Sequence, residues 1–282
     1  MTSMPIKSAQ PNWEAHLQLA FEYKNHKTIL SNKQHRGPLL VQRPFYPEDK
    51  KCCHVYIVHP PGGIVGGDNL HIHADINNTA HSLLTTPAAT KFYRSNGYIA
   101  TQTQMVNVAE NAVLEWLPQE TVFFNEANAA SSTIINIQNS SRIIAWEIQC
   151  LGLPANDLPF NQGSCVQKLE VWKNGAPILL DCNRIQGGAK ILTANWGLNQ
   201  HQAIGTMLAT DNIEHTYLDL LKKTASQHAA TLYACTTVHG LVIIRAMAKY
   251  AEQIKELFFS LWEVLRPELL NTPSCAPRIW NT

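Results

Sequence analysis

Short apolar runs separated by turn residues fill the first 210 positions of the chain. The turn residues recur every ~8–12 positions, a spacing typical of an all-β sandwich or a related architecture. The Asn174-Gly175 pair between the last two runs predicts a β-hairpin with a two-residue turn. No repeat of solenoid period is visible along these runs. The runs that predict strands are 17–23, 39–42, 54–58, 70–76, 82–85, 99–108, 113–116, 132–138, 142–150, 166–172 and 177–182.

From about residue 211 the pattern becomes partly helical. Segment 213–227 predicts a helix, and segments 232–236 and 241–245 predict a strand pair. Apolar residues from Ile254 to Leu265 fall at helical spacing, which predicts an amphipathic helix that packs on the sheet and ends at Pro267.

The predicted fold class is therefore mainly β: a large multi-stranded architecture of stacked sheets with two α-helices near the C-terminus. We expect one domain over residues 1–282. Its β-rich part covers residues 1–210. The helix–strand pair–helix of residues 211–282 completes the same unit.

Composition and charge exclude several classes of protein. The net charge is +1 and charged residues make up 15%, which argues against a nucleic-acid binder because such a protein needs a basic surface. Apolar residues make up 45%, which argues against disorder. The seven cysteines are odd in number and form no C-x-x-C, so they indicate neither a disulfide framework nor a zinc ribbon. Neither a secretory signal nor an apolar run of ~20 residues is visible, and a cytoplasmic protein is expected.

A loop rich in glycine and proline, 59–68 (HPPGGIVGGD), follows an apolar run. Glycine permits a positive φ and close backbone approach, while proline fixes φ, so this loop is sharply shaped. It lacks the Lys and Ser or Thr of a phosphate-binding P-loop and does not match the dinucleotide fingerprint. Because it ends on Asp68, it suits a cation or the N–H groups of a partner better than phosphate. The alternative is a purely structural turn.

Catalytic signals are weak, since neither H-E-x-x-H nor G-x-S-x-G occurs. His71 and His73 share one face of a predicted strand and could bind a transition metal, or they form a polar strand face. Carboxylates lie in or beside the apolar runs, and each either faces solvent or lines a wet interior, because a buried unpaired carboxylate is costly. These carboxylates are Glu115, Glu120, Glu147 and Glu170.

Seven motifs stand in one order along nearly the whole chain. They are 43–48 (RPFYPE), 59–68 (HPPGGIVGGD), 84–95 (LTTPAATKFYRS), 114–121 (LEWLPQET), 146–152 (WEIQCLG), 160–163 (F-x-x-G) and 277–280 (PRIW). In this order they resemble the urease accessory protein UreD family, called UreH in some bacteria. The resemblance implies a largely β protein with two helices near its C-terminus, and a role that is not enzymatic.

The resemblance also implies partners and a cargo. The family acts with UreF and the GTPase UreG in a complex with apourease, and this complex delivers nickel to the urease site. UreD is viewed as the component that contacts apourease and offers an internal path for nickel. No tightly bound cofactor is expected, only transient Ni²⁺, and neither nucleic acid nor a membrane is an expected partner. In this family GTP is used by the partner UreG, which fits the lack of a P-loop pattern in this chain.

A path for Ni²⁺ needs weak, exchangeable ligands, because a closed cage of soft ligands would trap the ion. We therefore predict that Asp68 and several of the other candidates line a wet interior path. The candidate metal-path residues are Asp68, His59, Glu48, Glu120, Glu147 and Glu170. Arg278 and Trp280 are the predicted partner-binding residues, because Arg and Trp are enriched at interface hot spots.

Two other functions stay open from the sequence. The first is a purely structural adaptor that bridges the GTPase and apourease without handling nickel. The second is a metal-dependent hydrolase with His71, His73 and Asp68 as metal ligands.

Overall fold

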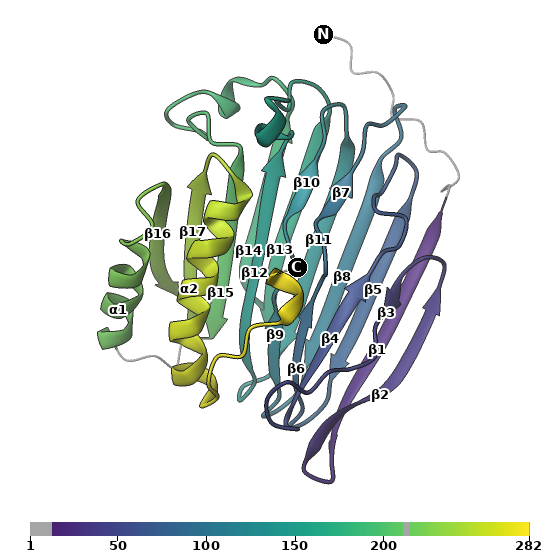
Figure 1. The fold of residues 1–282 in the computed structure, drawn as a ribbon, viewed down its shortest axis with the longest axis vertical. Coiled ribbons are helices and arrows are strands. Elements are labelled where there is room, and N and C mark those ends of the chain that lie inside the picture. Colours follow the sequence, from purple (N-terminus) through teal and green to yellow (C-terminus); the bar gives the residue numbers. More distant parts are fainter. Residues whose placement is uncertain (1–12, 211–214, 282) are drawn as a thin grey trace.

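The computed structural model describes residues 13–210 and 215–281 as two stacked β-sheets with two α-helices against the outer face of one sheet (Figure 1). The first sheet has the strand order β14-β13-β11-β8-β5-β1-β2. The second has the order β16-β17-β15-β12-β9-β6-β4-β3, with β10 and β7 added beside β12. The predicted fold class is confirmed.

The strands of the first sheet are β1 (Glu14–Lys24), β2 (Lys27–Arg36), β5 (Asn69–Ile76), β8 (Ala100–Val108), β11 (Asn128–Ile137), β13 (Ser164–Lys173) and β14 (Ala176–Gln186). Those of the second are β3 (Leu40–Val41), β4 (Cys52–Val58), β6 (His81–Thr85), β7 (Thr90–Phe92), β9 (Val113–Trp116), β10 (Thr121–Phe123), β12 (Arg142–Leu151), β15 (Ala203–Thr210), β16 (Thr231–Val238) and β17 (Leu241–Ala248). The helices are α1 (His215–Ala225) and α2 (Ala251–Leu270), and 3₁₀ turns cover Pro154–Asn156, Lys190–Leu192 and Arg278–Asn281.

The central part of the chain coils back and forth between the two sheets. From β4 to β13 the main strands alternate between the second sheet and the first, and neighbours within each sheet are parallel. Strands of the second sheet begin at residues 52, 81, 113 and 142, about 30 residues apart, which is a solenoid-like period. The backbone thus follows a repeat that is not visible in the sequence. The connecting loops differ in length and composition, which hides the repeat in the residue types.

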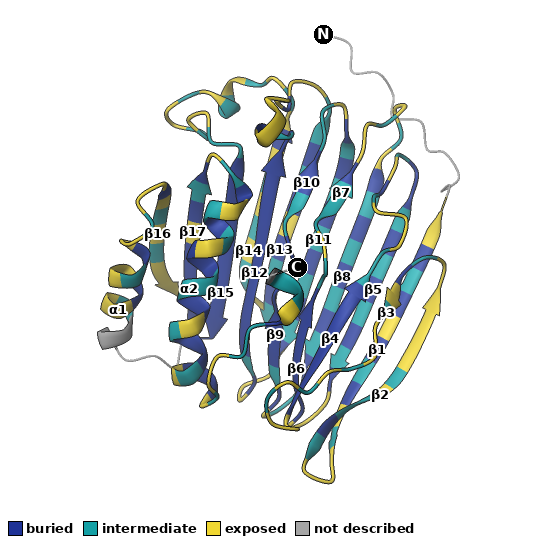
Figure 2. Ribbon diagram, viewed as in Figure 1, coloured by how far each residue is buried: buried dark blue, intermediate teal, exposed yellow. Residues whose placement is uncertain are grey.

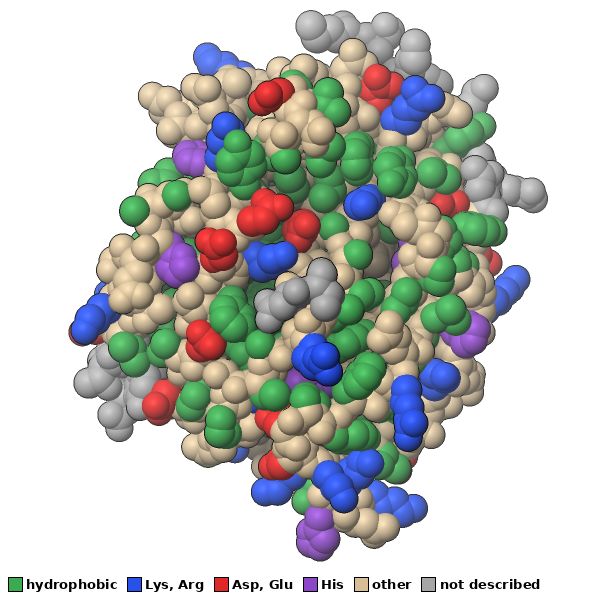
Figure 3. All heavy atoms as spheres, in the orientation of Figure 1, with side chains coloured by type: hydrophobic (Ala, Val, Ile, Leu, Met, Phe, Trp, Pro, Cys, Tyr) green, Lys and Arg blue, Asp and Glu red, His purple; other side chains and the backbone are tan. Residues whose placement is uncertain are grey.

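Parallel pairing gathers the long connections at one end of the molecule. The segments 59–68, 86–99, 117–127 and 152–163 all leave the C-terminal ends of second-sheet strands and meet at the top of Figure 1, and we call this region the loop end. Short turns at 77–80, 109–112 and 138–141 lie at the opposite end. Figure 3 shows hydrophobic side chains gathered over the loops at the top of the viewed face.

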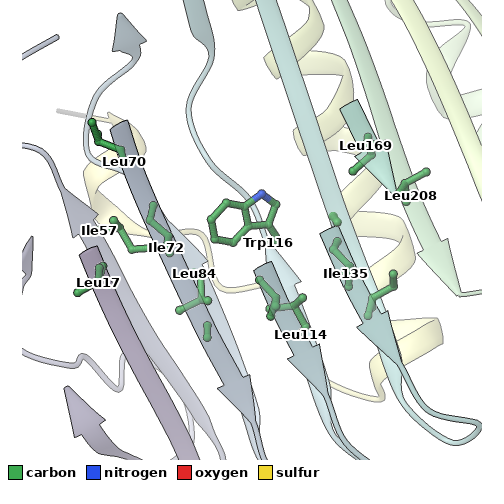
Figure 4. Close-up of a cluster of buried hydrophobic side chains, with 14 of the residues drawn as sticks. Leu17, Ile57, Leu70, Ile72, Leu84, Leu114, Trp116, Ile135, Leu169 and Leu208 are labelled. Atoms are coloured by element: carbon green, nitrogen blue, oxygen red, sulfur yellow. The ribbon is translucent and has the colours of Figure 1, made fainter. Parts of the chain in front are cut away.

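The core lies between the sheets, where residues alternate between inward and outward positions. Figure 2 shows this alternation as bands of buried and partly exposed residues along β5, β8 and β11. Figure 4 shows Trp116 among aliphatic side chains from both sheets. The labelled members are Leu17, Ile57, Leu70, Ile72, Leu84, Leu114, Ile135, Leu169 and Leu208.

A second apolar layer holds α2 against the outer face of the second sheet. The predicted apolar stripe of this helix is buried, from Ile254 to Leu265. The predicted end of the helix at Pro267 is wrong, because α2 continues to Leu270. Two interactions hold this last turn: Leu269 and Leu270 are buried, and Arg142 Nη1 donates to the Leu269 carbonyl at 2.8 Å. Part of the predicted start of the first helix falls in residues 211–214, outside the described residues.

The predicted hairpin at Asn174-Gly175 is confirmed, because β13 and β14 pair antiparallel around it. Both residues have positive φ, 50° and 79°. This is the backbone conformation that an Asn-Gly pair in a two-residue hairpin turn favours.

Gly163 provides a stability prediction for the loop end. Its φ is +94°, and a Cβ there would overlap the backbone of Ala127. We expect Gly163→Ala to lower the free energy of unfolding by about 1–3 kcal/mol because it adds both a strained φ and a steric clash. Gly97→Ala is the matched control, since Gly97 has a φ of +98° but open space around it. Urea unfolding gives the loss of stability in each variant, and the difference between the two losses measures the effect of the steric clash. Equal losses in the two variants would show that the clash has no effect.

Candidate functional site

A strip of polar side chains crosses the otherwise apolar space between the sheets. On the first sheet, strand pairing places four of them side by side: Gln102, Ser131, Gln167 and Asn183. On the second sheet, three more lie in register: Glu147, Thr206 and Arg245. We call these seven residues the polar strip. Polar groups at inward positions need partners or water, so the polar strip must be satisfied by hydrogen bonds within the chain or by solvent.

Glu147 lies at the centre of the polar strip and is 8% exposed. The Thr133 hydroxyl and the Gln167 amide donate hydrogen bonds to its carboxyl group and join the two sheets. Burial raises the pKa of Glu147 to about 7, with a smaller contribution from the charge of Asp181, although the two hydrogen bonds oppose the shift. Glu147 therefore changes charge near neutral pH, which is unusual for a carboxylic acid.

A cavity of about 310 Å³ leads from the loop end to Glu147. Gln102, Gln104, Ser131 and Glu147 line its inner part, and segments 59–60, 62–64 and 86–91 line its outer part. Three buried polar atoms of its lining have no hydrogen-bond partner within the described part of the chain: Gln102 Oε1, His59 Nε2 and Trp116 Nε1. Such atoms require water or an ion, so the cavity is wet.

A groove of about 340 Å³ lies at the other end of the polar strip. Its polar lining comes from Gln149, Asn183, Thr206 and Arg245, and the buried Oε1 atom of Gln149 is also without a partner among the described residues. Gln167 lies on β13, between the cavity residue Ser131 on β11 and the groove residue Asn183 on β14. The Glu147–Gln167 contact therefore separates the cavity from the groove.

The glycine-rich loop forms part of the cavity wall, but Asp68 turns back into the loop. Asp68 is 2% exposed, and its Oδ2 accepts a hydrogen bond from the Val65 N–H at 3.0 Å. Burial lowers the pKa of His59, which lines the cavity, while the charge of Asp68 opposes this shift. Gly63 permits close packing against Tyr93, because a Cβ there would overlap the ring. The geometry of loop 59–68 thus allows it to pack against the segment that carries Tyr93, and the hydrogen bond of Asp68 stabilises the loop from within.

Glu48 belongs to a second buried cluster, beneath the C-terminal half of α2. Arg266 Nη2 lies 2.6 Å from Glu48 Oε1, and Arg266 Nε lies 3.0 Å from Glu115 Oε2. His54 contacts Glu48 at 2.7 Å, and His81 contacts Glu115 at 2.7 Å. Trp262 Nε1 also donates to Glu115 at 2.7 Å. We call this set the Arg266 cluster.

The Arg266 cluster contains groups of a kind that bind metals, but an internal cation already occupies it. Cys52 shares one close group with Glu48 and His54, and another with His81 and Glu115. Burial opposes ionisation of both carboxyls, yet hydrogen bonds from His54 and Arg266 lower the pKa of Glu48 to about 2. His81 and Arg266 likewise lower the pKa of Glu115. Burial holds the pKa of the Cys52 thiol well above its usual range, so no thiolate is available to bind a metal. The positive charge that the two carboxylates need comes from Arg266.

The remaining predicted residues lie elsewhere. Glu120 is half-buried beside β10 and is not among the residues that line the cavity. Glu170 lies on the outer face of the first sheet, where it accepts a hydrogen bond from Trp172 Nε1 at 3.0 Å. Trp280 packs against Trp146 and donates to Thr85 Oγ1 at 2.9 Å, so it anchors the C-terminal segment within the chain.

Arg278 is exposed in the last 3₁₀ turn, two residues before Trp280. The two predicted partner-binding residues therefore differ in accessibility. Arg278 is exposed, while the indole of Trp280 is already packed within the chain.

The histidines considered as hydrolase ligands do not converge. His71 stacks on His16 with ring centroids 4.8 Å apart, while His73 contacts Asp75 at 3.1 Å. Both lie on the outer face of the first sheet, whereas Asp68 points into its own loop. These three residues form no common ligand set.

The sequence did not identify the glutamines of the polar strip or Arg245. A signal was present for Gln102 and for the cavity residue Gln104: both occur in phase with Ala100 and Val106, which face inward along β8. Polar residues at inward positions of an alternating strand indicate either a paired network or a wet interior. Arg245 carried no comparable signal, because its role depends on the pairing of β15 with β17.

Comparison with known proteins first assigns a class. A family model described as "UreD urease accessory protein" matches residues 14–281, nearly the whole chain, so the class is that of accessory proteins to urease. The chain is 39% identical to the urease accessory protein UreD of Enterobacter sp. (strain 638) over 285 residues, covering 100% of both proteins. It is 39% identical to that of Klebsiella aerogenes over 283 residues, covering 99% of both. The chain belongs to the UreD family, as its motifs predicted.

Of the helices in the described residues, none is both long enough and apolar enough to cross a membrane.

Proposed function

We propose that this chain supports nickel insertion into apourease, in a complex with UreF and the GTPase UreG, and that Ni²⁺ passes along the polar strip. The observation that carries the proposal is the row of inward polar groups centred on Glu147, which a wet cavity connects to the loop end. A protein that only bridged partners would need no polar route through its core, because inward polar groups destabilise a core unless they are satisfied.

The chemistry of the strip suits a passing ion rather than a stored one. Its donors are carboxylate, amide and hydroxyl oxygens, which hold Ni²⁺ more weakly than imidazole or thiolate ligands do. Amide oxygens of Gln102, Gln149 and Gln167 have no partner among the described residues and are available as ligands. Glu147 contributes a charge that is lost on protonation, so it can bind and release the ion near neutral pH.

The experiment compares two glutamates in cells that lack this chain. Rescue by Glu147→Gln tests the polar strip, while Glu170→Gln removes the same charge from the outer face of the first sheet. We expect Glu147→Gln to lower urease activity and the nickel content of urease at least tenfold. Glu170→Gln should rescue within twofold of wild type, and both variants should co-purify with UreF and apourease.

Two outcomes would favour other functions. If Glu147→Gln rescues fully, the chain acts as a structural adaptor that does not handle nickel. If deletion of the chain leaves urease active and loaded with nickel, the proposed role is wrong as a whole. The hydrolase alternative has no support from the positions of His71, His73 and Asp68 described above.

A further inference from the structure

β14 is an edge strand of the first sheet, and its neighbour across the space between the sheets is β17, which pairs with β15 and β16 in the second sheet. An ion pair joins these two strands: Arg245 Nη1 lies 2.8 Å from Asp181 Oδ2. The side chain of Arg245 is 49% exposed, whereas that of Asp181 is 14% exposed. Arg245 also lines the groove at this end of the polar strip. The pair therefore stands where the polar strip reaches the lateral surface.

Arg245 lies in line with Glu147. The pairing of β12, β15 and β17 sets Glu147, Thr206 and Arg245 in one row across the second sheet. A guanidinium keeps its charge at every physiological pH, so a cation that leaves Glu147 toward the groove approaches a fixed positive charge. At the loop end, Lys91 lines the outer part of the cavity, whereas the inner lining residues Gln102, Gln104 and Ser131 are uncharged.

Asp181 is a second carboxylate close to the route. Its charge contributes to the raised pKa of Glu147, so the two acids interact through the interior. Asp181 lies two residues from Asn183 on β14, on the same face of that strand. While Arg245 is paired with it, its charge is neutralised and offers little attraction to a passing ion.

We infer that the Arg245–Asp181 ion pair is a gate at the lateral end of the polar strip. Paired, it closes this end to cations; when Arg245 turns outward, Asp181 becomes the next carboxylate along the path from Glu147. This inference rests on the proposed passage of Ni²⁺ along the strip. It adds a direction to that passage, from the loop end to a lateral end that opens only when Arg245 moves.

The position of Arg245 suits a movable gate. Half of its side chain faces solvent, and the ion pair joins side chains of two different sheets rather than lying within one sheet, so Arg245 can swing out without breaking a strand ladder. Because about half of the Arg245 side chain is already exposed, water can solvate its guanidinium as it leaves Asp181, which lowers the free energy that opposes opening.

The test is Ni²⁺ binding to the purified full-length chain, measured by equilibrium dialysis and calorimetry. Arg245→Gln removes the barrier and frees Asp181, so we expect it to tighten Ni²⁺ binding at least tenfold. The double variant Arg245→Gln/Asp181→Asn should lose this gain. Arg245→Lys retains a positive charge and should stay within threefold of wild type. Arg184→Gln, an exposed arginine on the outer face of β14, is the matched control and should stay within twofold.

The outcomes separate the gate from the path. If Arg245→Gln binds Ni²⁺ as wild type does while Glu147→Gln weakens binding, the gate is overturned and the path stands. If Glu147→Gln leaves binding unchanged, both the path and the gate are wrong. Circular dichroism and thermal unfolding of each variant confirm that binding is compared between folded chains. A gain in Arg245→Gln that persists in the double variant would also overturn the role of Asp181.

Discussion

Replacement of Arg266 by Met should lower the free energy of unfolding by about 3–5 kcal/mol, the usual effect of removing one partner from a buried ion pair. The guanidinium is fully buried and bonds to Glu48 and Glu115 at once. Met retains much of the length of the side chain and its contact with Trp262, so the loss reports chiefly on the two carboxylates left without their cation. Urea unfolding followed by tryptophan fluorescence measures the change.

The compensated variant shows whether charge is the cause. Adding Glu48→Gln and Glu115→Gln to Arg266→Met removes the stranded charges and should recover most of the loss. Arg184→Met is the control for an exposed arginine and should change stability by less than about 0.5 kcal/mol.

The difference in stability between wild type and Arg266→Met should also shrink as the pH falls from about 4.5 toward 2. Glu48 has a lowered pKa of about 2, so the stability it contributes is present above the ordinary carboxyl range and is lost on acidification. A loss no larger than that of Arg184→Met would contradict this account.

Much of the fold could be predicted because its signals are local. Strand alternation, the Asn174-Gly175 turn and the apolar stripe of α2 each depend on residues close in sequence. β2 (Lys27–Arg36) and β15 (Ala203–Thr210) escaped prediction for opposite reasons. β2 is an edge strand with mostly polar, exposed residues, while β15 is buried on both faces and shows no alternation.

The candidate site could be predicted only in part, because it depends on pairing between distant segments. Glu147 stood out as an acid within an apolar run, but the same reasoning applied to Glu170, which faces outward. Glu48 was among the candidates, yet its partner Arg266 lies 218 residues away. The polar strip itself follows from parallel register across β8, β11 and β13, which residue types alone do not specify.

Glu147 should make the fold less stable as the pH rises from about 4.5 to 7. In the unfolded chain its carboxyl loses a proton near 4.5, whereas in the folded chain it keeps the proton until about 7. The folded state therefore binds more protons within this window, so stability is full below it and falls through it. The difference corresponds to about 3 kcal/mol at 1.36 kcal/mol per pKa unit. Glu147→Gln stays neutral and should lack this loss.

The measurement is urea unfolding at pH 5 and pH 8 for wild type, Glu147→Gln and Glu170→Gln. The stability of Glu147→Gln relative to wild type should rise by about 2–3 kcal/mol between the two pH values, and Glu170→Gln is the control for removing a charge from the outer face of the first sheet. Comparing two pH values cancels any constant difference in the hydrogen bonds to Thr133 and Gln167. Parallel pH curves for wild type and Glu147→Gln would show that Glu147 titrates normally.

The same linkage connects the stability of the chain to its proposed cargo. A carboxylate that is costly to ionise in the interior is stabilised when a cation joins it, because the ion replaces the lost solvation. Ni²⁺ added at pH 8 should therefore raise the free energy of unfolding of wild type, because an ion that binds the folded state stabilises it. The free energy of unfolding of Glu147→Gln should stay nearly unchanged. At pH 5, where Glu147 retains its proton, Ni²⁺ should have little effect on either protein. Equal stabilisation of both proteins at pH 8 would place the bound ion away from Glu147.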